Sequence, residues 1–146
     1  MTETDNIGKK YPFTWLVERG KIRELVEAIG DDNPVYQGAE ASREKGYKDM
    51  VAPPTFTTVP LLWSGALFQA FDDLEVEVSR TVHAQQSCEF YQEIFPGDTL
   101  EGVVEVKDIT HKKGKSGNLK FIQFEITYTN QRNELVSKEE MLVITR

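Results

Sequence analysis

The sequence MVAPPTFTTVPLLWSGALFQAF, residues 50–71, contains no charged side chain, although 28% of the whole chain is charged. Its second half, residues 61–71, is apolar almost all round, with only Ser64, Gly65 and Gln69 interrupting the run. A helix without a polar face must be covered on all sides, either in a protein core or in lipid. This stretch therefore predicts a buried central helix or a membrane span.

The prolines in the first half of this stretch decide between the two. Pro53, Pro54 and Pro60 oppose helical geometry before the two adjacent prolines. Thr57 or Thr58 is the favoured N-cap, because Pro60 then lies in the first turn. What remains is a helix of roughly 12 to 17 residues, about 18–25 Å long. We therefore reject the membrane span and expect a buried helix wrapped by a sheet.

The composition restricts the class of protein. A chain of 146 residues fits one domain with a sizeable core. Its net charge of −7 argues against nucleic acid and against an anionic membrane as partners. The single cysteine, Cys88, excludes an internal disulfide and indicates a reducing compartment, and no targeting peptide is recognisable. We expect a cytoplasmic protein with a flexible N-terminus over residues 1–10 and a single domain over residues 11–146.

The hydrophobic pattern predicts the elements on either side of the central stretch. Apolar residues at i, i+3, i+4 and i+7 predict a helix over residues 19–29, capped by Gly30. Period-two patterns predict strands at 11–17, 82–94, 100–109, 122–129 and 135–145, and other signals predict a short helix at 38–45 and a basic loop at 111–118. Helices followed by consecutive antiparallel strands indicate the α+β class, with an antiparallel sheet around the long central helix.

Motifs for several common chemistries are absent from the sequence. It has no glycine-rich phosphate loop, no Cys/His metal spacing and no Gly-x-Ser-x-Gly elbow, so we expect no metal and no cofactor. His111 lies in a charged loop and His83 lies early in a predicted strand, where solvated and structural roles respectively are favoured. Cys88 in mid-strand is more typical of a small buried residue than of a nucleophile.

The most informative segment is Gly-Asp-Asp-Asn-Pro-Val-Tyr, residues 30–36. Followed by Gly-Tyr at 46–47 and VAPPTF at 51–56, it resembles the Gly-Asp-x-Asn-Pro-aliphatic-His signature of MaoC-like (R)-specific enoyl hydratases and dehydratases. VHAQQSCEFY at 82–91 and FPGDTL at 95–100 resemble the long strand and the Pro-Gly-Asp turn of the same family. The resemblance covers nearly the whole chain and implies the hot-dog fold, usually paired into a dimer or a double hot dog.

The resemblance implies addition of water to, or its removal from, an acyl thioester. In that family an Asp and a His transfer protons, and a backbone N–H at the start of the central helix polarises the thioester carbonyl. Asp31 matches the acid, and Asn33 matches the asparagine after it. Tyr36 stands at the histidine position, where a phenol with an ordinary pKa near 10 is a poor base. Pro54 stands where the family has a glycine, and it offers no N–H.

This combination is similar to the N-terminal branch of fatty-acid-synthase-type dehydratases and to the non-catalytic subunit of two-subunit (3R)-hydroxyacyl-ACP dehydratases. The resemblance therefore implies an acyl-chain-binding, catalytically impaired subunit of a (3R)-hydroxyacyl-thioester dehydratase or (R)-enoyl hydratase. Such a hydro-lyase would be active only with a catalytic hot-dog partner, and its ligand would be an acyl-CoA or acyl-carrier-protein thioester. The expected site residues are Asp31 and the degenerate Tyr36 at the catalytic positions, and Asn33, Pro54, Thr55, Phe56 and Trp63 for substrate binding.

Three alternatives stay open. A self-sufficient homodimeric dehydratase would use Asp31 with Tyr36 or His83. A non-enzymatic acyl-thioester-binding module would bind its ligand without turnover, with the lysines of residues 111–118 near a phosphate. A hot-dog thioesterase ranks last, because residues 50–71 contain no carboxylate.

Overall fold

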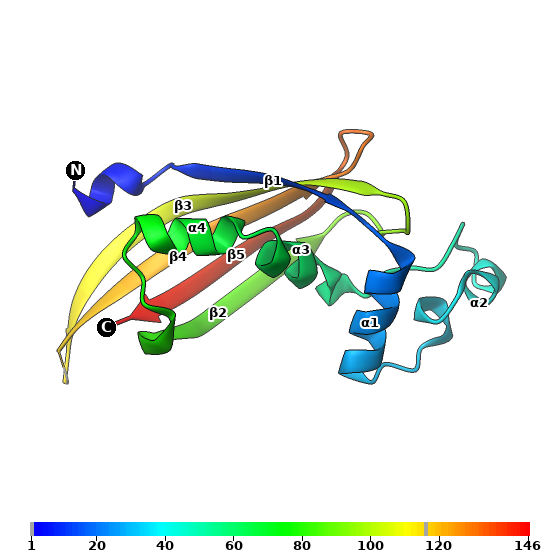
Figure 1. Cartoon of the computed structure of the whole chain (residues 1–146), viewed down its shortest axis with the longest axis horizontal. Coiled ribbons are helices and arrows are strands. Elements are labelled where there is room, and N and C mark those ends of the chain that lie inside the picture. The colour runs from blue at the N-terminus through cyan, green and yellow to red at the C-terminus, as the bar shows by residue number, and fades with distance from the viewer. Residues whose placement is uncertain (1, 116) are drawn as a thin grey trace.

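An antiparallel sheet curves around a line of helices in the computed structural model, which describes residues 2–115 and 117–146 (Figure 1). Within these ranges the sheet has five strands in the order β1-β3-β4-β5-β2. Their bounds are β1 Lys10–Leu16, β2 Thr81–Phe90, β3 Thr99–Gly114, β4 Gly117–Thr129 and β5 Leu135–Thr145. The predicted α+β class with an antiparallel sheet is confirmed.

The central stretch forms three segments instead of the single helix that we predicted. A 3₁₀ helix over Pro54–Thr57 leads into α3 (Thr58–Trp63), and α4 (Ala66–Asp73) follows. Gly65 separates α3 from α4 because its φ of +81° is left-handed, a conformation that glycine adopts without steric cost. The single long helix was therefore wrong, although an α-helical start at Thr58 agrees with the prediction.

The sheet covers one side of these helices and leaves the other side open. Leu61, Leu67 and Phe71 belong to the core beneath α3 and α4. In contrast, Leu62 and Trp63 are 49% and 73% exposed, and Phe68 of α4 is 43% exposed. Exposed large apolar residues on one face of a helix are typical of an interaction surface. The sheet therefore wraps one face of the helices, as expected, and the other apolar face is left exposed in the chain by itself.

The N-terminal helix and the short helix form as the pattern predicts. Helix α1 (Arg19–Ile29) buries Ile22 and Val26, and Gly30 ends it with a φ of +67°. A 3₁₀ turn over Pro34–Tyr36 and helix α2 (Ala39–Glu44) follow. Figure 1 shows α1 and α2 beside the end of the sheet from which α3 begins. These elements therefore bring the informative segment close to the start of the central stretch.

Three strand boundaries differ clearly from the prediction: the end of β2, the end of β3 and the start of β4. Strand β2 ends at Phe90, four residues before the expected end. The N–H groups of Tyr91 and Gln92 both donate to the carbonyl of Val136, and the chain then reaches the central stretch, where the carbonyl of Ile94 accepts from Ala52. Most of the predicted basic loop is paired strand, with His111 opposite Lys120 and Lys113 opposite Asn118. Ser116, which lies in that loop, is outside the described residues.

The N-terminal residues carry some regular structure. Glu3 lies in a 3₁₀ turn, and its Oε1 accepts from Nζ of Lys120 at 2.6 Å. Lys10 is already the first residue of β1, whereas Met1 lies outside the described residues. The flexibility of residues 1–10 and the domain boundary at residue 11 stay predictions.

The Pro-Gly-Asp turn precedes β3 and is held by one buried carboxylate. Asp98 is 3% exposed, and its Oδ2 accepts from the backbone N–H of Phe95 at 2.9 Å. Its Oδ1 accepts from Nε2 of Gln131 at 2.8 Å, which links the turn to the β4–β5 connection.

Among the described residues, we find no helix long and apolar enough to cross a membrane.

Candidate functional site

Two side chains of the informative segment shape its own turn. The Oδ1 atom of Asp31 accepts from the backbone N–H of Asn33 at 2.9 Å. The Oδ1 atom of Asn33 accepts in turn from the N–H of Val35 at 3.3 Å, which caps the 3₁₀ turn that carries Tyr36. Local hydrogen bonds of this kind are why Asp and Asn occur so often in turns. One oxygen of the predicted catalytic acid is therefore occupied by the backbone.

Asn33, Tyr36 and Pro54 line one recess of about 440 Å³. The backbone N–H of Val51 donates to the carbonyl of Val35 at 3.1 Å, which places the start of the central stretch against the turn. Asp31 instead lines a neighbouring hollow at the C-terminal end of α1. The structure therefore brings three of the predicted site residues together and sets the acid to one side. The recess is completed by Val35, Lys45, Tyr47, Val51 and Glu93.

The electrostatics of the recess make Tyr36 a poor base. Burial raises the pKa of its phenol, and the charges of Asp31, Glu93 and Tyr47 raise the pKa further. The phenol therefore keeps its proton at neutral pH and can donate a hydrogen bond, but it cannot remove a proton as an imidazole does.

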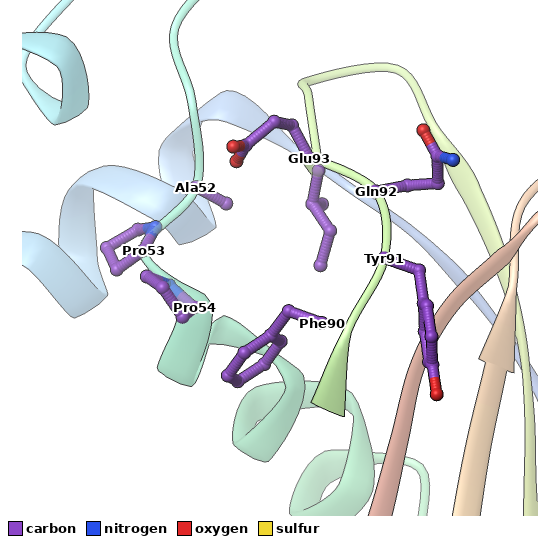
Figure 2. A pocket seen from close by; sticks show the side chains of 8 residues that line it. Ala52, Pro53, Pro54, Phe90, Tyr91, Gln92 and Glu93 are labelled. Atoms are coloured by element: carbon purple, nitrogen blue, oxygen red, sulfur yellow. The ribbon is translucent and has the colours of Figure 1, made fainter. Parts of the chain in front are cut away.

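Pro54 also lines a second recess, of about 260 Å³, between the central stretch and the segment after β2 (Figure 2). The N–H of Ala52 donates to the carbonyl of Ile94 at 2.9 Å and joins its two walls. Figure 2 shows the ring of Phe90 facing Pro54, with the Glu93 carboxylate on the side of Ala52. Because a proline has no N–H, Pro54 cannot donate to a carbonyl placed at this end of the helix.

An apolar groove of about 290 Å³ runs between the central helices and β2. Helices α3 and α4 form one wall, and β2 and β5 form the other. Its lining is predominantly hydrophobic with a few polar groups, which is typical of sites for apolar ligands. The lining residues are Thr58, Leu61, Leu62, Leu67, Phe68, Phe71, Val78, Thr81, His83, Gln86, Met141 and Val143.

The remaining predicted residues lie in different surroundings. Phe56 is fully buried in the core, and Thr55 is exposed. Trp63 is exposed at the end of α3, where the Nζ atom of Lys21 lies 5.4 Å from its ring centroid. Cys88 is exposed, so the prediction of a small buried residue was wrong. Partial desolvation and the neighbouring charge of Glu139 raise the pKa of its thiol, which opposes a nucleophilic role. The binding roles of Thr55, Phe56 and Trp63 stay predictions.

Sequence reasoning missed three polar residues of these hollows. Tyr47 and Glu93 face Tyr36 across the recess, and Gln86 lines the apolar groove. Tyr47 follows Gly46 in a segment that the resemblance had already marked, whereas nothing in the local pattern distinguishes Glu93 from a solvated residue. In the described ranges, we find no group of three or more His, Cys, Asp or Glu side chains suited to a metal ion.

Solved structures share this fold. One protein in the crystal structure of the C-terminally truncated HadBC (3R-hydroxyacyl-ACP dehydratase) complex of Mycobacterium tuberculosis has a TM-score of 0.82 at 24% identity, with 98% of this chain and 99% of that chain covered. A MaoC-like dehydratase has a TM-score of 0.85 at 27% identity, with 99% of this chain but only 43% of that chain covered. The sheet, the central helices and these neighbours define a hot-dog protein of the dehydratase class.

The chain belongs to the FAS1-like dehydratase family, because the model of the family's dehydratase domain region matches residues 6–139. Curated relatives agree over nearly the full length. A UPF0336 protein of Saccharopolyspora erythraea is 35% identical over 142 residues, which cover 96% of this chain and 88% of the relative. A UPF0336 protein of Thermobifida fusca is 32% identical over a region that covers 96% of this chain and 91% of the relative. The predicted resemblance is confirmed.

Proposed function

We propose that this chain is the acyl-chain-binding, catalytically impaired subunit of a (3R)-hydroxyacyl-thioester dehydratase or (R)-enoyl hydratase. It would work with a second hot-dog subunit that supplies the catalytic Asp and His. An acyl-CoA or acyl-carrier-protein thioester would be the ligand, with its thioester near Pro54 and its chain in the apolar groove.

The observation that carries this proposal is the pairing of Tyr36 and Pro54 on one recess. The phenol of Tyr36 stays protonated, and Pro54 has no N–H for a thioester oxygen. The carboxyl of Asp31, the third part of the machinery, is retained: it lines the hollow at the end of α1, and one of its oxygens accepts from the backbone. Loss of a general base or of an oxyanion donor each removes on the order of a hundredfold in rate or more.

The exposed edge of the sheet supports a second subunit. Strand β2 is exposed along most of its ten residues, and Glu89 is its one formally charged side chain when histidine is neutral. The opposite edge strand, β1, is shorter and contains Lys10 and Pro12, which discourage strand pairing. A long, nearly uncharged edge is suited to pairing with another sheet, and the apolar faces of Leu62 and Phe68 lie beside it.

The test is co-expression with a hot-dog protein from the same genome that has an intact Asp-x-Asn-Pro-x-His segment. We expect this chain alone to hydrate crotonyl-CoA at the background rate and the purified pair to hydrate enoyl thioesters at an enzymatic rate. In the pair, Asp31→Asn in this chain should leave kcat within about twofold, whereas the same change in the partner should abolish turnover. Enzymatic hydration by the chain alone, lost in Asp31→Asn, would contradict the proposal and identify a homodimeric enzyme.

A further inference from the structure

One polar pair lies in the sheet beneath the apolar groove. Gln86 of β2 lines the groove, and its Nε2 donates to Oε2 of Glu139 on β5 at 2.9 Å. Glu139 is fully buried, and its Oε1 accepts from the hydroxyl of Ser137 at 3.4 Å. Within residues 2–115 and 117–146 we find no Lys, Arg or His in a salt bridge with this carboxyl. The shortest hydrogen bond given for this buried carboxyl is therefore the one from Gln86.

The contacts of Gln86 determine which end of its amide faces the groove. Its Nε2 also donates to Sγ of Cys88 at 3.9 Å, so the nitrogen serves both acceptors. An amide nitrogen has two N–H bonds and no acceptor capacity, so these two contacts use it fully. The part of the chain that the structure describes supplies no donor to Oε1. Gln86, which lines the groove, thus has in its Oε1 atom an acceptor that no donor of the described residues uses.

Most of the residues that line the groove with Gln86 are apolar, among them Leu67, Phe71 and Met141. The other polar lining residues are Thr58, Thr81 and His83. Phe90, which lines the recess beside Pro54, is four residues further along β2, or ~13 Å at the rise of an extended strand. Under the function proposed above, a chain whose thioester lies near Pro54 would reach Gln86 in its interior.

We infer that the groove prefers an acyl chain that carries a hydroxyl group in its interior over a plain alkyl chain. A plain alkyl chain would displace water from Oε1 of Gln86 without offering a donor in its place. A hydroxyl group would instead donate a hydrogen bond to this oxygen. Sites built to hydrogen-bond a ligand group discriminate strongly against analogues that lack it. Gln86 is then a specificity-determining residue, and Glu139 is the positioning residue that orients its amide. This inference rests on the proposed function.

The test is calorimetric binding of hexadecyl-CoA thioether probes to the whole chain. One probe is unsubstituted, and the others carry a single hydroxyl group at successive interior carbons. We expect one hydroxyl position to bind about tenfold more tightly than the plain probe, as one good hydrogen bond allows. The ratio should fall to one or below in Gln86→Leu and should fall partway in Glu139→Gln, because an amide at 139 no longer dictates the orientation of Gln86.

Two further variants keep this test decisive. Gln85→Leu makes the same change one residue earlier in β2, where the side chain points to the other face of the sheet, and should leave the ratio unchanged. If Gln86→Leu does not fold, the double variant Gln86→Leu, Glu139→Leu removes the acceptor without leaving a carboxyl buried alone. Equal affinity for all probes, or a preference that persists in the Gln86 variants, would overturn this inference and leave the proposed acyl-binding function standing. Failure of every probe to bind would overturn the proposed acyl-binding function as well.

Discussion

At the scale of the residue, the proposed loss of activity rests on two substitutions, Tyr36 and Pro54. Proline has no N–H to donate and the phenol keeps its proton, whereas Asp31 keeps its carboxyl, of which one oxygen accepts from the backbone of its own turn. The two substitutions could be predicted from the sequence, because residue identity alone decides whether an N–H or an imidazole is present. The placement of Asp31 outside the recess could not, because it depends on how residues 30–36 fold against α1.

We predict that activity returns only when the base at position 36 and the N–H donor at position 54 are restored together. In the chain alone, Tyr36→His should leave crotonyl-CoA hydration near background, because the thioester oxygen still lacks its donor. Tyr36→His with Pro54→Gly should raise the rate on the order of 100-fold above the unmodified chain. Steady-state hydration assays measure this, with Asp31→Asn in the double variant as the control that should cancel the gain. A gain of the same size from Tyr36→His alone would show that Pro54 is no obstacle.

At the scale of the element, the central stretch shows what periodicity predicts well and where it fails. The apolar run correctly predicts that Leu61, Leu67 and Phe71 are buried, because burial follows side-chain polarity. The break at Gly65 was missed, since an isolated glycine inside an apolar run is compatible with a continuous helix. The extension of β3 through His111 and Lys113 was missed for a related reason: polar residues at a hairpin end pair through their backbones, which composition does not reveal.

Substitution by alanine should change the free energy of unfolding in opposite directions at Gly65 and Gly20. No atom lies within 4 Å of a Cβ built at either position, so only backbone conformation decides the outcome. Gly65→Ala should lower the free energy of unfolding by about 1 kcal/mol, because its φ is +81°. Gly20→Ala, inside α1, should raise the free energy of unfolding by up to about 1 kcal/mol. Urea unfolding at one fixed protein concentration measures both, and a stabilising Gly65→Ala would mean that α3 and α4 can merge.

At the scale of the whole molecule, the two edges of the sheet differ. The β1 edge is short and contains a proline and a lysine, whereas the β2 edge is longer and nearly uncharged. The hot-dog fold could be predicted from the resemblance, and the α+β class from the pattern of elements. Which strands lie at the two edges could not be predicted, because the strand order depends on long-range pairing that local sequence does not encode.

We predict that a lysine on the β2 edge prevents assembly. Ser87→Lys places a charge in the exposed strand and should reduce association with a hot-dog partner at least tenfold, since a lysine on an edge opposes strand pairing. Thr14→Lys is the matched control on β1: Glu101 lies directly opposite Thr14 as Glu140 lies opposite Ser87, so the two variants differ in the edge and not in the charge that faces the new lysine. Sedimentation velocity of the mixtures measures the effect, and equal loss in both variants would argue against pairing through β2.

The exposure of Trp63 allows assembly to be followed by tryptophan fluorescence. The chain contains one other tryptophan, Trp15, whose indole Nε1 is buried without a hydrogen-bond partner among the described residues. Trp63 is 73% exposed at the end of α3, so its fluorescence should be red-shifted in the free chain and should move to the blue if a partner subunit excludes water from this face. Trp63→Phe should erase that spectral change, and the intrinsic signal would then titrate complex formation without any attached dye.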